Sequence, residues 1–136
     1  MSYALTATLD LPFGAAVDQV RTALAEQGFG VLTEIDLQAT LRAKLGVEVP
    51  QHVILGACNP PLAHAALQAE PSIGLLLPCN VVVRTAGDGT TIVEAVDPQT
   101  MVALTGNAAL QVVANDAARR LTAALAGLAD RPAKGK

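Results

Sequence analysis

The chain has 136 residues, of which 51% are hydrophobic and only 15% are charged, so it can bury a substantial core within one domain. Its net charge is −3, it has no Trp, and aromatic residues make up 2% of it. These values argue against a nucleic-acid partner, because such binding needs clustered cations and usually stacking aromatic side chains.

Hydrophobic periodicity divides the chain into strands and helices. A period of two predicts a half-buried strand, whereas repeats at three and four residues predict an amphipathic helix. In chain order, the pattern predicts strands at 2–9 and 29–35, helices at 13–27 and 37–45, a strand at 52–57, a helix at 62–69, strands at 79–85 and 91–96, and a long helix that Asn107 opens and that runs to 128.

Two of these segments and one stretch outside them carry more specific expectations. Alternation in the second strand places Phe29, Val31, Thr33 and Ile35 on one face. The strand at 52–57 is apolar throughout, which predicts burial on both of its faces. Residues 72–77 are also apolar, and they fit either a turn of helix or the approach to the next strand.

The glycine-rich segment at 86–90 predicts a hairpin, whose two strands are antiparallel. Several other strands have a polar face, and no glycine-rich phosphate loop follows any of them. We therefore predict an α+β fold with a largely antiparallel sheet of about five strands and helices packed mainly on one face. Residues 1–129 would form a single domain, and 130–136 a flexible C-terminal tail.

Four short sequence motifs give independent support for this fold class: 28–36 (GFGVLTEID), 54–60 (ILGACNP), 74–81 (GLLLPCNV) and 96–98 (VDP). In this order they resemble the domain of unknown function 302 family over about residues 2–128. The resemblance implies a TATA-binding-protein-like α+β fold with a curved antiparallel sheet, and it implies a dimer. It implies no activity, because the family has none established.

The candidate site is built on the only two cysteines of the chain, each of which is followed by an asparagine at a strand end. If the two strands are antiparallel neighbours, these residues meet at one edge of the sheet. They could then form a small-ligand site, or bind a soft metal ion with His64 as third ligand. The candidate ligand-binding residues are Cys58, Asn59, Cys79 and Asn80.

Other roles stay open for the same residues. The cysteines could form a redox disulfide, Cys58 could be a thiolate beside a helix N-terminus, or both could pack as small core hydrophobes. Asn59 precedes Pro60 and fits a helix cap. Asn80 could hold a turn or face a ligand.

We expect a small-ligand or metal-binding module without turnover, because the chain offers no recognisable set of nucleophile and base. The alternatives are a thiol-dependent redox protein or enzyme that uses Cys58 and Cys79, and a structural interaction module. The N-terminus lacks signal-peptide features and no apolar run reaches membrane-spanning length, so we expect a cytoplasmic protein with no membrane partner. The low charge favours a homodimer.

Overall fold

The structure is a computed structural model that describes residues 2–129. Its centre is one five-stranded sheet in the order β1-β5-β4-β3-β2, and every neighbouring pair is antiparallel. The α+β prediction with a largely antiparallel sheet is therefore confirmed. The strands are β1 (Ala4–Leu9), β2 (Gly30–Asp36), β3 (His52–Cys58), β4 (Cys79–Thr85) and β5 (Thr91–Val96).

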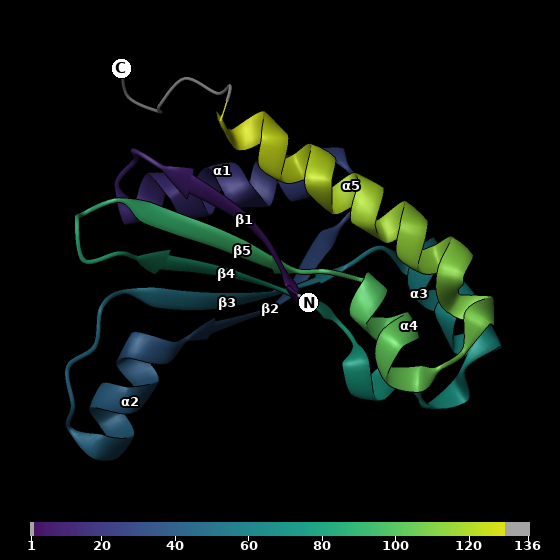
Figure 1. Cartoon of the computed structure of the whole chain (residues 1–136). Coiled ribbons are helices and arrows are strands. Elements are labelled where there is room, and N and C mark those ends of the chain that lie inside the picture. The colour runs from purple at the N-terminus through teal and green to yellow at the C-terminus, as the bar shows by residue number, and fades with distance from the viewer. Residues whose placement is uncertain (1, 130–136) are drawn as a thin grey trace.

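Two long helices lie over one face of this sheet, while the other helices stand at its two ends (Figure 1). The prediction that the helices pack mainly on one face is confirmed. The long pair are α1 and α5, with α2 at one end and a lobe of short helices at the other (Figure 1). The helices are α1 (Phe13–Glu26), α2 (Leu37–Leu45), α3 (Pro60–Ala69), η1 (Pro71–Leu76), α4 (Gln99–Thr105), η2 (Ala108–Leu110) and α5 (Gln111–Ala129).

The main core fills the space between the sheet and α1 and α5. Inward-facing aliphatic residues of the strands pack there against the apolar stripes of both helices. Members of this buried cluster include Val20, Leu24, Val53, Leu55, Ala57, Val81, Val83, Val93, Ala95 and Leu121.

The prediction that the third strand is buried on both faces is wrong. Val53, Leu55 and Ala57 face the helices and are buried, but Ile54 on the opposite face is only half-buried. No helix of the described residues crosses the middle of that face (Figure 1). The continuous apolar sequence of this strand therefore does not mean that helices cover both faces of the sheet.

The predicted alternation in the second strand is also wrong. Val31 pairs with Ala57 and Thr33 pairs with Gly56, so a β-bulge lies at Leu32. Two residues of β2 then oppose one residue of β3, so each side chain after the bulge points to the face opposite to the one that simple alternation predicts. Leu32 remains 67% exposed.

A second buried cluster holds the end lobe, which we define as α3, η1, α4 and η2. Residues 72–77, which the sequence left open, lie mostly in η1, and Ile73 there is fully buried. The long helix begins at Gln111 and not at Asn107, because Asn107 caps the short turn η2 before it. The second cluster consists of Ala66, Ile73, Met101, Leu110, Val113 and Ala114.

Two further predictions concern the C-terminal tail and membrane-spanning segments. The predicted tail at 130–136 lies outside the described residues. Among the residues that are described, no helix combines the length and the hydropathy needed to cross a bilayer.

Candidate functional site

A cavity of about 210 Å³ lies where the sheet meets the end lobe. We call it the thiol pocket, because the side chains of Cys58 and Cys79 are in its wall. The ends of β2, β3 and β4 form one side, and helices α3, α4 and α5 form the other. The pocket is lined by Phe29, Leu32, Ala57, Cys58, Asn59, Leu62, Ala63, Ala66, Leu77, Pro78, Cys79, Met101, Val113 and Ala117.

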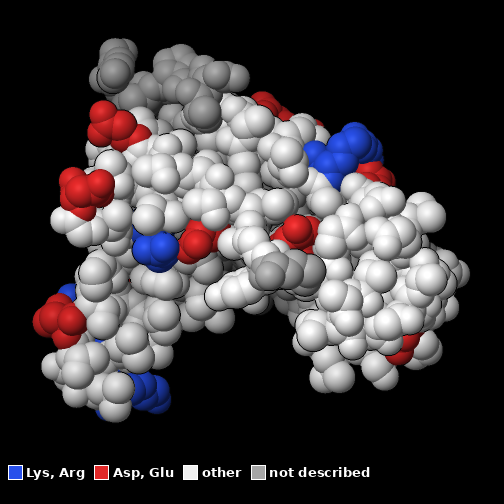
Figure 2. All heavy atoms as spheres, in the orientation of Figure 1, with Lys and Arg blue, Asp and Glu red and all other residues white. Residues whose placement is uncertain are grey.

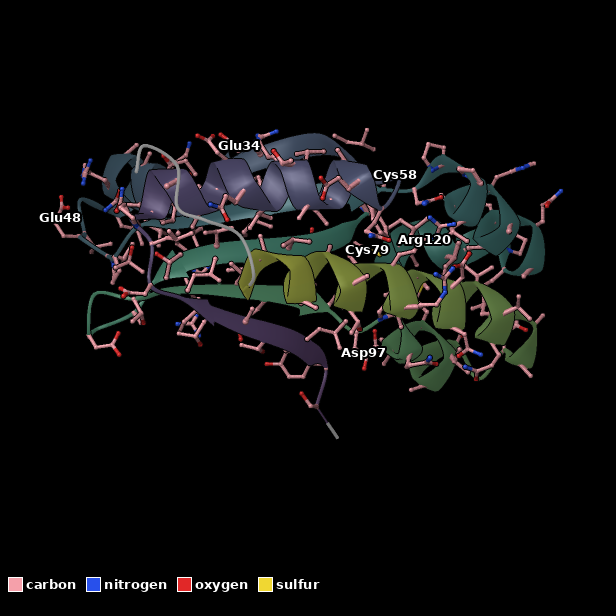
Figure 3. The ribbon with its side chains drawn as sticks, turned by 90° about the horizontal axis from the view of Figure 1, so that it is seen from above. Glu34, Glu48, Cys58, Cys79, Asp97 and Arg120 are labelled. Carbon is pink, nitrogen blue, oxygen red and sulfur yellow. The ribbon has the colours of Figure 1, made fainter. Side chains whose placement is uncertain are left out.

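Strand pairing explains why the two cysteines meet. β3 and β4 are antiparallel, and Ala57 pairs with Cys79, so Cys58 lies one register position away. Figure 3 shows both cysteines at the same end of the sheet, near Arg120 of α5. Neither cysteine is in a disulfide.

The environment of Cys79 favours the protonated thiol. Burial raises the pKa of Cys79 to about 11, and the nearby Cys58 adds to the effect. Cys79 keeps some accessible surface through the pocket that it lines, but the surrounding apolar walls desolvate its sulfur. At neutral pH this position therefore presents a neutral S–H group.

Asn59 combines a structural role with a place in the pocket wall. Its side chain is 7% exposed, and its Oδ1 accepts a hydrogen bond of 3.3 Å from the backbone N–H of Leu62. The helix-cap prediction is thus confirmed. Its Nδ2 faces the neighbouring turn at Gly28.

The N-terminus of α3 lacks the free N–H groups that anions bind. Pro60 and Pro61 have no N–H, and the N–H of Leu62 is used by the Asn59 cap. The next N–H, of Ala63, donates to the carbonyl of Asn59 at 2.9 Å. A phosphate or carboxylate would therefore find no backbone donors here, although helix N-termini commonly bind such groups.

A glycine turn at Gly28 packs against the side chain of Asn59. Gly28 has a φ of +84°, and a Cβ at this position would lie 3.0 Å from the Nδ2 of Asn59. Arg120 fixes the turn, since its Nη1 donates to the carbonyl of Gln27 at 3.1 Å while its Nε donates to Asp116 at 3.2 Å. The end of α1 is thereby held against the pocket wall.

The other two candidate residues lie outside the thiol pocket. Asn80 is exposed and lines a second cavity, of about 270 Å³, on the other side of Leu77 and Pro78. His64 is exposed on α3 and lines neither cavity. Within residues 2–129, no three His, Cys, Asp or Glu side chains are grouped so that they could hold a metal ion.

Sequence reasoning missed several wall residues of the pocket. Leu32 reaches the wall because of the bulge, which the alternation conceals. Met101 comes from α4, far along the chain, and only tertiary packing brings it to the cysteines. The one available signal was the apolar run at 75–77, of which Leu77 lines the pocket while Leu75 is 88% exposed.

Comparison with known proteins agrees with this architecture. The family model described as domain of unknown function DUF302 matches residues 5–128. The crystal structure of the uncharacterized conserved protein DUF302 from Bacillus stearothermophilus is similar, with a TM-score of 0.86 and 29% sequence identity over 93% of this chain and 98% of that chain. No curated protein matches the chain.

Proposed function

The chain belongs to the family of domain of unknown function DUF302, and from that premise we propose that it binds a small neutral molecule in the thiol pocket without chemical turnover. The observation that carries the proposal is the chemistry of the wall. Its residues are apolar apart from two thiols and one amide, and no charged side chain of the described residues lines it. Ligand pockets typically combine such apolar walls with a few polar groups that orient the ligand.

Neutrality of the ligand follows from three features of the wall. An anion would meet neither a cationic side chain nor a free N–H of α3. A soft metal ion would need thiolate ligands, and the raised pKa of Cys79 opposes deprotonation. The same pKa counts against Cys79 as the reactive thiol of the thiol-dependent alternative, because the thiolate is the reactive species.

A binding experiment with a neutral fluorescent dye tests the proposal. We expect N-phenyl-1-naphthylamine to bind with one site per chain, and Ala63→Phe to weaken binding at least tenfold. Ala63 is half-buried in the pocket wall, so a phenyl ring there fills the cavity. The measurement is a fluorescence titration of the reduced protein.

Leu67→Phe is the matched control, because Leu67 is 43% exposed on the same helix and lines no pocket wall. It should bind the dye as the wild type does. Equal binding by the Ala63→Phe and wild-type proteins would contradict the proposal. Absence of any binding would favour the alternative of a structural interaction module.

We also propose that the chain forms a homodimer through the end lobe and the open face of the sheet. Leu75 and Leu104 on this lobe are 88% and 72% exposed. Figure 2 shows a hollow beneath the sheet and a lobe beside it with almost no charged atoms. Arg84 and Glu94 pair with each other at 2.9 Å on the open face, which leaves little unpaired charge to oppose an apolar partner.

Sedimentation velocity tests the dimer. We expect the wild type to sediment as a dimer at micromolar concentration, and the Leu75→Glu/Leu104→Glu variant to sediment as a monomer. Two carboxylates buried at an interface without partners oppose association. Leu45→Glu, at the other end of the sheet and 69% exposed in the wild type, should leave the dimer intact. A monomeric wild type would exclude the proposal.

A further inference from the structure

The thiol pocket and the second cavity share one wall. Four residues line both spaces: Leu77, Pro78, Cys79 and Met101. The two cavities measure about 210 Å³ and 270 Å³, so this wall divides a space that would otherwise take a much longer molecule. The second cavity also has polar side chains at its edge, from Asn80 and Thr100.

The wall has two parts with different freedom. Residues 77–79 lead directly into β4, where Cys79 pairs with Ala57, so the backbone of this part is held by the sheet. Met101 enters from α4, and its side chain is 5% exposed. A methionine side chain is unbranched and adaptable, so Met101 is the part of the wall that one substitution can remove while the strand pairing stays intact.

We propose that Met101 determines the length of the ligand that the thiol pocket accepts, and that the ligand is a neutral single-chain aliphatic molecule. The inference rests on the proposed function. The aliphatic wall suits the chain, and the side chain of Met101 stops the chain at the border of the second cavity. Removal of Met101 joins the two cavities and admits longer chains.

A series of straight-chain primary alcohols, from 1-butanol to 1-dodecanol, tests this inference by displacement of N-phenyl-1-naphthylamine. For the wild type we expect affinity to rise about fourfold with each added CH₂ and then to level off at a limiting length. In Met101→Ala the rise should continue to longer chains. Leu77→Ala trims the same wall from its other side and should shift the limit in the same direction, which keeps the test valid if one variant does not fold.

Val102→Ala is the control, because Val102 adjoins Met101 in α4 and lines neither cavity. Its limiting length should equal that of the wild type. If alcohols bind but the limit is the same in Met101→Ala and Leu77→Ala, the inference fails while the proposed function stands. If neither the dye nor any alcohol binds the wild type, the proposed function itself fails. A shift in Val102→Ala as large as in Met101→Ala would overturn the role of Met101.

Discussion

Replacing Gly56 by alanine is expected to lower the free energy of unfolding by about 3 kcal/mol. A Cβ at this position would approach the Oγ1 of Thr33 more closely than real Cβ atoms do, and it would lie 2.8 Å from the Cγ of Pro78. Both neighbours belong to ordered segments, since Thr33 pairs directly with Gly56 and Pro78 leads into β4. The side chain of Thr33 must therefore rotate and the Pro78 ring must move, or the strands must shift.

The sign of this effect is opposite to the usual one. In a strand interior, alanine is normally more stabilising than glycine by about 0.5–1 kcal/mol, because glycine loses more conformational entropy on folding. Gly30→Ala, in the same strand pair, is the matched control: its nearest contact would be the carbonyl oxygen of Cys58 at 4.0 Å. Urea unfolding should show a small change for Gly30→Ala and a large loss for Gly56→Ala.

A second substitution identifies the clash. Thr33→Ala removes the Oγ1 that the new Cβ meets, so Gly56→Ala/Thr33→Ala should recover part of the lost stability, with Pro78 accounting for the rest. Equal and small losses for both glycine variants would contradict the close packing at Gly56. Because Pro78 also lines the thiol pocket, Gly56→Ala should weaken dye binding.

The meeting of the two cysteines was predictable from sequence on the condition that their strands are antiparallel neighbours. A glycine-rich turn at 86–90 and strands with one polar face indicate an antiparallel sheet, and antiparallel order puts the end of the strand at Cys58 beside the start of the strand at Cys79. The cap at Asn59 was predictable as well, because Asn-Pro is a local signal. The cap depends only on neighbours along the chain, whereas the meeting of the cysteines also requires that β3 and β4 are antiparallel neighbours.

The rest of the site depends on packing that a sequence pattern does not contain. The bulge at Leu32 shifts the register by one residue and places Thr33 directly opposite Gly56. Met101 reaches the cysteines because the end lobe folds back beneath α5. Asn80 follows a cysteine exactly as Asn59 does in sequence, yet strand alternation points it away from Cys79 and into the second cavity.

Raising the pH from 9 to 11 is expected to destabilise the wild type by about 2 kcal/mol more than it destabilises Cys79→Ala. Burial raises the pKa of Cys79 to about 11 in the folded state, whereas a thiol in the unfolded chain titrates near its ordinary value of about 9. Below pH 9 both states hold the proton, so the contribution of Cys79 is constant. Between pH 9 and 11 the unfolded state loses the proton first, and stability falls.

Urea unfolding under reducing conditions at pH 8, 9, 10 and 11 measures this difference. Lysine and tyrosine groups titrate in every variant, so the comparison between variants cancels them. Cys58→Ala retains the buried thiol of Cys79 and should keep most of this pH dependence, reduced by the loss of the smaller contribution that Cys58 makes to the raised pKa of Cys79. A Cys79→Ala profile that runs parallel to the wild type over this range would show that the sulfur of Cys79 is not desolvated.

The pH profile also bears on function. If the folded pKa is about 11, only about one Cys79 side chain in a thousand is a thiolate at pH 8. A protonated Cys79 is a poor metal ligand and a poor nucleophile, and it can line a pocket for a neutral chain, as the proposed ligand requires. A flat difference between the two profiles would remove this support and return Cys79 to the candidates for thiol chemistry, so one stability measurement separates the two uses of the same pocket.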